Sequence, residues 1–116
     1  MKLPYIELDR EHDDPAIIYN VTTKVETSVS ADWIRWMQEV HIPEIIGTGC
    51  FEKAMILQLT EVDESEGPTF AVQYSAQSKA MYNRYVSSFA DGLRKKAEAK
   101  WGARIISFRT VLRVVN

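Results

Sequence analysis

The sequence predicts an α+β fold in which one sheet of four strands is covered on one face by two helical regions. Four segments alternate apolar and polar residues with the period of two that a half-buried strand requires. Two further segments repeat apolar residues at the spacing of an amphipathic helix. These segments follow one another in the order βαββαβ, which is that of the ferredoxin-like sandwich with a four-stranded antiparallel sheet.

The first half of the chain is expected to hold one strand and two helices. The strand is expected at residues 16–26, where Thr, Val, Ile and Tyr dominate. A helix should follow it, because the hydroxyls of Ser28 and Ser30 are suitable N-caps. Pro43 cannot continue that helix unbroken. It is suited instead to the first turn of a short second helix at 43–48.

The second half should hold a hairpin, a long helix and a last strand. Strands at 50–61 and 69–77 flank an acidic segment with the composition of a turn, so they should pair with each other. Ser78 is expected to cap the long helix, in which Gly92 would mark a bend. The last strand is expected at 104–115. Right-handed crossovers would place both helical regions on the same face of the sheet.

The two faces of the predicted sheet differ in composition. The apolar positions, which should face the helices, are Ile17, Tyr19, Val21, Val25, Phe51, Met55, Leu57, Leu59, Phe70, Val72, Tyr74, Ile106, Phe108, Leu112 and Val114. The alternate positions, which should lie on the uncovered face, include Asn20, Thr22, Gln58, Gln73, Ser75, Ser107 and Arg109. A freely solvated face would carry more Lys and Glu. These mostly neutral hydrogen-bonding groups therefore favour a semi-enclosed polar surface.

We expect the uncovered face to meet a second copy of the chain, so that the protein is a homodimer. Closed two-fold dimers are the commonest oligomers. Two such sheets packed face to face would form a barrel of about eight strands, and a barrel of that size can hold one small ligand. The alternative is a monomer whose uncovered face is solvated.

Length and composition indicate a single domain at 16–116, preceded by an acidic N-terminal extension at 1–15. The net charge of −2 and the lack of a Lys/Arg stripe argue against nucleic acid as a partner. No apolar run is long enough to span a membrane and no signal segment is recognisable, so a cytoplasmic location is expected. Cys50 is the only cysteine and the chain has two histidines, so neither a disulfide nor a zinc site is expected.

Four stretches of the sequence resemble the domain-of-unknown-function family 4286. They are IIYNVTTKV (17–25), DWIRWMQEVHIPEIIGTGCF (32–51), FAVQYSAQ (70–77) and FRTVLRVV (108–115). The most specific part is the Trp-x-x-Trp-Met block with His-Ile-Pro-Glu and Thr-Gly-Cys-Phe after it. The family looks like a branch of the dimeric α+β barrels, which include cofactor-free quinol monooxygenases, haem-degrading enzymes and lactone isomerases. The resemblance implies a ferredoxin-like protomer and a face-to-face dimer, and it selects no reaction.

His41 is the candidate catalytic residue. It follows the first amphipathic helix, and histidine titrates near neutral pH, so it can act as a general base or acid. The resemblance adds that a histidine near the first helix of related barrels often faces the pocket. Two alternatives stay open, which are that His41 caps the end of the helix or, less favoured, that it binds haem.

Six other residues are candidates for substrate binding. They are Arg109, Asn20, Gln73, Ser107, Trp33 and Trp36. Arg109 could hold a carboxylate by paired hydrogen bonds. Trp33 and Trp36 are neighbours on one helix surface and could form the wall of a pocket. The alternatives are that the polar residues form a network between two subunits and that the tryptophans belong to the core.

The leading functional prediction is binding of a small planar or carboxylate-bearing molecule between the sheet and the helices, with no cofactor. An enzyme of this kind would use His41 as a base in proton transfer or oxygenation. The competing prediction is a non-catalytic dimerisation or regulatory module with a filled polar interior. A ligand site requires a cavity of roughly 300 Å³ that His41 or Arg109 reaches.

Overall fold

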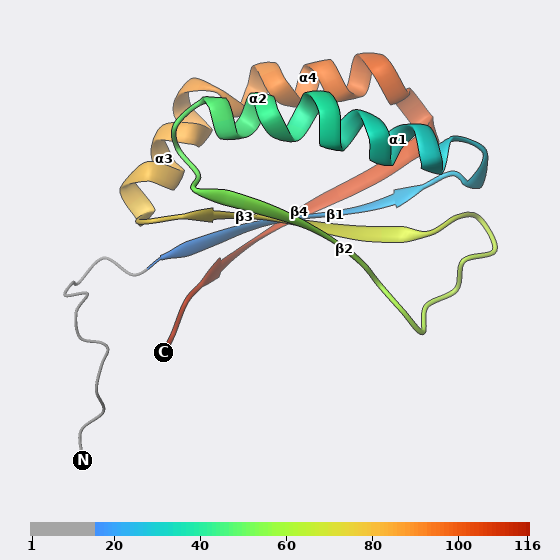
Figure 1. Ribbon diagram of the computed structural model, residues 1–116, viewed down its shortest axis with the longest axis horizontal. Coiled ribbons are helices and arrows are strands. Elements are labelled where there is room, and N and C mark those ends of the chain that lie inside the picture. The colour runs from blue at the N-terminus through green and yellow to red at the C-terminus, as the bar shows by residue number, and fades with distance from the viewer. Residues whose placement is uncertain (1–15) are drawn as a thin grey trace.

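The computed structural model describes residues 16–116, so the expected extension at 1–15 lies outside the described residues. Its main elements are β1 (Ile17–Val25), α1 (Ser30–Trp36), α2 (Ile42–Gly47), β2 (Lys53–Gln58), β3 (Thr69–Ala76), α3 (Lys79–Ser88), α4 (Ala90–Trp101) and β4 (Ile105–Arg113). One layer of helices lies over one face of a twisted sheet (Figure 1). This arrangement confirms the predicted ferredoxin-like sandwich.

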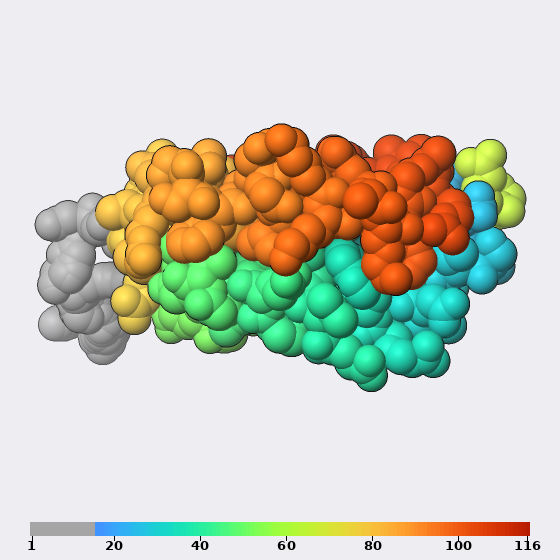
Figure 2. Space-filling model, turned by 90° about the horizontal axis from the view of Figure 1, so that it is seen from above, coloured from blue at the N-terminus to red at the C-terminus, as the bar shows by residue number. Residues whose placement is uncertain are grey.

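The sheet has the strand order β2-β3-β1-β4, and all three pairs of neighbouring strands are antiparallel. The predicted hairpin between the second and third strands is therefore confirmed. β1 and β3 occupy the centre, and β2 and β4 are the edges. Seen from the helix side, α1 and α2 lie beside α3 and α4 and together they cover the sheet (Figure 2). Among the described residues, no helix is long and apolar enough to cross a membrane.

The first helical region is divided near Pro43 as predicted, because a short second helix, α2, begins there with Pro43 in its first turn. α1 passes into a π-helical turn at Met37–His41, and α2 follows directly. The backbone N–H of Ile42 donates to the carbonyl of Met37, five residues earlier, which is the pattern of a π turn. Proline lacks an N–H and cannot make the usual bond at the next position, so the widened turn lies where an α-helix would be interrupted.

The helix caps agree with the sequence in part. No side chain caps α1 at its N-cap residue Val29, so the prediction for Ser28 and Ser30 is wrong. Ser78 caps α3, because its hydroxyl accepts a hydrogen bond from the Met81 N–H at 3.2 Å, as predicted. The long helix is interrupted at Phe89, where φ is −130°, and not at Gly92.

The core fills the space between the helices and the two central strands. β1 and β3 place alternate residues toward the helices as predicted, and Tyr19, Val25, Val72 and Tyr74 are all buried. The remaining buried apolar residues are Ile17, Trp33, Met37, Ile45, Cys50, Phe51, Phe70, Ala76, Tyr85, Ala90 and Trp101. The helices therefore cover the apolar face of the central strands, as the sequence predicted.

In the edge strand β2, the residues predicted to face the helices lie on the uncovered face of the sheet, and the alternate residues face the helices. Ala54 pairs with Tyr74, and Ile56 pairs with Val72, so both share the helix-facing side of the buried β3 residues. Met55, 54% exposed, and Leu57, 38% exposed, lie on the uncovered face. The prediction that Met55 and Leu57 pack under the helices is wrong.

In the edge strand β4, the two sets of alternate residues also lie on the faces opposite to those predicted. Arg109 pairs with Val21, and Ser107 pairs with Thr23, so these two polar residues lie beneath the helices. Ile106 and Phe108 lie on the uncovered face and are 69% and 61% exposed. The prediction that Arg109 and Ser107 lie on the uncovered face is therefore wrong, as is the predicted burial of Ile106, Phe108 and Leu112 beneath the helices.

Candidate functional site

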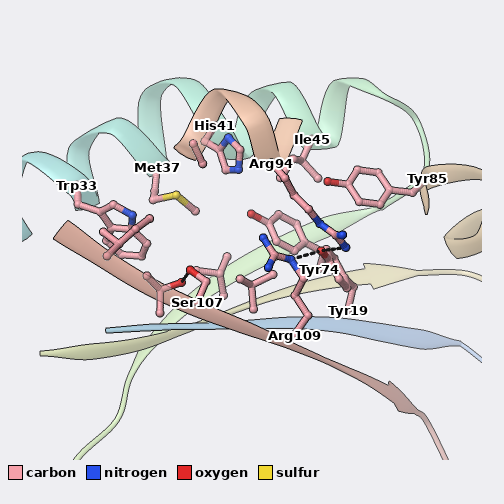
Figure 3. Close-up of a pocket in the computed structure, with 15 residues that line it drawn as sticks. Tyr19, Trp33, Met37, His41, Ile45, Tyr74, Tyr85, Arg94, Ser107 and Arg109 are labelled. Carbon is pink, nitrogen blue, oxygen red and sulfur yellow. Dashed lines mark hydrogen bonds between the residues drawn. The ribbon is translucent and has the colours of Figure 1, made fainter. Parts of the chain in front are cut away.

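A small cavity lies between the sheet and the helices (Figure 3). Its volume is about 50 Å³, which is room for a few water molecules or a group of similar size. Residues from both layers line it: Tyr19, Val21, Thr23, Trp33, Met37, His41, Ile45, Val72, Tyr74, Tyr85, Arg94, Ala97, Ile105, Ser107 and Arg109. His41 and Arg109 both reach this cavity, as the ligand-binding prediction requires, but its volume is well below roughly 300 Å³.

His41 enters the cavity from the last position of the π-helical turn, and its ring points down toward the sheet (Figure 3). Its imidazole stacks on the indole of Trp36, with ring centroids 4.6 Å apart. Its Nδ1 is buried and has no hydrogen-bond partner. The helix continues through His41 into α2, so the residue is not the C-terminal cap that the sequence left open.

The surroundings of His41 keep its imidazole neutral at pH 7. Burial disfavours the charged form, and nearby Arg109 and Lys96 disfavour it further, while Glu44 opposes them in part. Together these effects lower the pKa of His41 to about 4. A neutral imidazole can accept a proton or a hydrogen bond from a group in the cavity.

Two arginines meet at one tyrosine on the floor of the cavity. Arg109 on β4 donates from Nε to the hydroxyl of Tyr19 at 3.1 Å. Arg94 on α4 donates from Nη2 to the same oxygen at 3.2 Å. The Nε of Arg94 is buried and has no hydrogen-bond partner. No Asp or Glu from the described part of the chain lines the cavity, so the two guanidinium groups make this side of it positively charged.

Aromatic rings form part of the remaining wall, beside aliphatic side chains. The ring of Tyr19 lies 5.9 Å from that of Tyr74 and 5.6 Å from that of Tyr85, measured between centroids. Burial raises the pKa of Tyr74 and that of Tyr85 well above the usual value, so both phenols stay neutral. The site therefore combines a cationic floor, neutral hydroxyl groups and flat apolar surfaces.

The structure brings together four of the seven residues predicted from the sequence. His41, Arg109, Ser107 and Trp33 line the cavity. Trp33 is also core, because it is 2% exposed and its ring stacks on Phe70 at 5.3 Å. The hydroxyl of Ser107 forms a hydrogen bond of 2.8 Å with the Thr23 hydroxyl.

The other three predicted residues lie outside the cavity. Trp36 does not line it and acts only through its stacking on His41. Asn20 and Gln73 pair with each other on the uncovered face of the central strands. The side-chain amide of Asn20 donates to the hydroxyl of Thr22 at 3.1 Å, and its Oδ1 is buried without a partner.

Sequence reasoning missed Arg94 and assigned Tyr19 to the core alone. A signal for Arg94 was present, because Ala90, Arg94, Ala97 and Trp101 follow one another at helical spacing along a single face of α4. Ala90 and Trp101 on that face are buried. A charged residue in the middle of a core-facing row requires a partner, and here it is the Tyr19 hydroxyl.

The described part of the chain offers no obvious metal site. Within residues 16–116, no group of three or more His, Cys, Asp or Glu side chains is arranged to hold a metal ion. Cys50 is buried and free.

Three solved structures share the fold. A dimeric ferredoxin-like protein from an uncultured marine organism is 13% identical, with a TM-score of 0.64 over 89% of this chain and 98% of its own. A candidate antibiotic biosynthesis monooxygenase from Bacillus cereus is 16% identical, with a TM-score of 0.56 over 88% of this chain and 95% of its own. A candidate monooxygenase from Shewanella loihica is 12% identical, with a TM-score of 0.53 over 90% of this chain and 99% of its own.

At these identities, the structural likeness shows the fold alone. No curated protein matches the sequence. The family model described as a domain of unknown function, DUF4286, matches residues 16–115, as the sequence resemblance predicted. This match spans nearly all of the described fold, and the chain therefore belongs to the DUF4286 family.

Proposed function

We propose that the protein binds a small molecule in the cavity beneath its helices and acts as a face-to-face homodimer. The observation that carries this proposal is that His41 and Arg109, which lie on opposite layers, line one cavity. Such convergence of a few polar groups in a pocket otherwise lined by aliphatic and aromatic side chains is typical of ligand sites. Arg109 is exposed, so a ligand larger than the cavity can extend past it.

The chemistry that the site supports best is proton transfer to His41 without a cofactor. The imidazole is neutral, its Nδ1 has no partner, and it faces the cavity. The arginines on the floor would stabilise negative charge that develops when the ligand loses a proton. Two structural neighbours are candidate monooxygenases, which supports an enzymatic role for a protein of this fold.

The uncovered face supports the dimer. Leu57, Ala71, Thr22 and Phe108 form one row across all four strands of the sheet. Met55, Ile106 and Leu112 also lie on this face, and all three are exposed. Large apolar side chains that share one exposed face are typical of a protein interface. A dimeric structural neighbour adds support.

One observation favours a second candidate function. The cavity of about 50 Å³ is smaller than most ligand sites, and side chains fill much of the space around it. A non-catalytic dimerisation module would have such an interior, in which the Tyr19 and arginine hydrogen bonds serve only to fix the packing of α4 on the sheet.

A fragment-binding experiment separates the two functions. The ¹⁵N-labelled protein is titrated with small acids, amides and phenols, and backbone amide shifts report where each one binds. Ligand binding predicts shifts that cluster around the cavity and a tenfold or larger loss of affinity in His41→Gln. Glu39→Gln, an exposed residue on the same π-helical turn, is the matched control and should bind as the natural chain does. Fragments that never shift the cavity residues would favour the dimerisation module.

A further inference from the structure

We propose that the cavity is a carboxylate site, in which Arg94 and Arg109 together hold the acid group of a small organic acid. This inference rests on the proposed function and names the class of ligand. It also assigns a ligand-binding role to Arg94, which the sequence did not single out.

The first argument is the charge of the site. Arg94 and Arg109 come from different layers of the fold and share one neutral acceptor, the hydroxyl of Tyr19. Two like charges near each other repel, and within residues 16–116 no carboxylate lines the cavity to compensate them. Glu44, which lies close enough to influence His41, is paired with Lys96 at 2.8 Å. A ligand that brings its own negative charge would complete the site.

The second argument is the supply of hydrogen-bond donors. The hydroxyl oxygen of Tyr19 accepts from both arginines, so its own hydrogen points away from them. The buried Nε of Arg94 has no acceptor. Each guanidinium also keeps further N–H groups beyond the one that Tyr19 accepts. The floor of the cavity is therefore rich in donors, and a carboxylate supplies about four acceptor positions on two oxygens.

The third argument is size and shape. A cavity of about 50 Å³ accommodates roughly four heavy atoms, which is the size of acetate. Its walls include the flat rings of Tyr74 and Tyr85, which suit a planar group better than a tetrahedral one. His41 lines the same cavity, so a carboxylate held by the arginines would share that cavity with the imidazole.

The test follows the side-chain Nε–H signals of the arginines by NMR while the protein is titrated at constant ionic strength. Acetate is the probe, acetamide is its neutral counterpart of the same shape, and inorganic phosphate is the tetrahedral oxyanion. Acetate should shift the Arg94 and Arg109 signals together, and acetamide should leave them unchanged. Arg94→Met and Arg109→Met should each weaken acetate binding at least tenfold.

Arg35→Met is the matched control, because Arg35 forms only an exposed pair with Asp32 on the outer surface of α1, and its acetate affinity should not change. If Arg94→Met fails to fold, Arg94→Lys keeps the charge but loses the paired donors, and it should still weaken acetate binding severalfold. Equal acetate binding in the natural chain and in the variants that fold would overturn the carboxylate site.

Two further outcomes would overturn the carboxylate site and indicate another class of ligand. Tighter binding of phosphate than of acetate would assign the arginines to tetrahedral oxyanions. Binding of neutral fragments that depends on His41 but not on Arg94 would refute the carboxylate site while leaving the proposed function intact. If no fragment of any class binds in the cavity, both proposals fail.

Discussion

The imidazole of His41 lies nearly parallel to the indole of Trp36, with an interplanar angle of 18° and ring centroids 4.6 Å apart. Trp36 in turn meets Trp101 of α4 edge to face at 5.8 Å. The indole shields one face of the imidazole from water. This contact between two residues of one helical region helps to explain why a histidine near the protein surface stays uncharged.

Stability should fall in acid because of His41. Its pKa is about 4 in the folded protein and about 6.5 in the unfolded chain, so between these values the unfolded chain binds more protons. The contribution of His41 is complete above pH 6.5 and is lost as the pH falls toward 4. We expect this loss to reach about 1–3 kcal/mol, after allowance for partial exposure.

The measurement is urea unfolding of the natural chain and of His41→Gln at several values between pH 4 and pH 7. The difference between the two free energies of unfolding isolates His41 from the carboxylates that titrate in the same range. Glutamine does not titrate, so the variant should lose less stability than the natural chain on acidification. Parallel curves for the two proteins would show that His41 is protonated as easily in the fold as outside it.

Removing the hydroxyl of Tyr19 should destabilise the packing of α4 on the sheet. Tyr19→Phe deletes the acceptor of both arginine hydrogen bonds and leaves the ring in place. Hydrogen bonds to charged groups contribute about 1.5–3 kcal/mol each, but both guanidinium groups can regain water, so we expect a loss of about 1–2 kcal/mol. Tyr82→Phe is the control in thermal unfolding, since Tyr82 is half-buried and its ring also packs on Tyr19. Equal losses in the two variants would mean that the shared acceptor contributes nothing.

Two glycines should respond in opposite ways to alanine. Gly67 has φ of +132°, and an added Cβ would overlap the carbonyl oxygen of Val25. Gly67→Ala must therefore move the hairpin loop away from the end of β1, and we expect the free energy of unfolding to fall by about 3 kcal/mol or more.

Gly92 lies inside α4 with open space around it. Gly92→Ala should stabilise the helix by about 0.5–1 kcal/mol, and chemical unfolding of both variants measures the contrast. If Gly92→Ala destabilised the protein, the predicted bend at that residue would regain support.

The element order could be predicted from the sequence because most of the strands and helices repeat apolar residues at a clear local period. The residues of β1 and β3 that face the helices could also be predicted, because these central strands alternate cleanly between apolar and polar residues. β2 could not be oriented in this way, since Ala54, Met55, Ile56 and Leu57 are all apolar and fit either face. Phe51 is buried, but a bend follows it before the strand begins. The alternation counted from Phe51 therefore assigned Met55 and Leu57 to the wrong face of the sheet.

The reversal of β4 has a different physical cause. Apolar residues are expected to point inward, but Phe108 points away from the helices while Arg109 lies beneath them. Arg109 is tolerated there because it extends toward the partly open cavity and bonds Tyr19. The rule that apolar residues face the core holds only where the other face of the sheet stays in water, and the proposed face-to-face dimer would instead bury Phe108 on the uncovered face. The same reversal moved Arg109 from the predicted dimer surface into the candidate site.

The proposed dimer should depend on the row of residues Leu57, Ala71, Thr22 and Phe108 on the uncovered face. Phe108→Glu places a charge among Thr22, Ala71 and Leu57 of the row and should weaken self-association at least a hundredfold, because a buried unpaired carboxylate is costly. Val86→Glu is the matched control, since Val86 is 43% exposed on α3 in the helix layer. Sedimentation equilibrium should show a dimer for the natural chain and the control, and a monomer for Phe108→Glu at the same concentration. A monomeric natural chain, or an unaffected dimer in Phe108→Glu, would place the interface elsewhere or remove it.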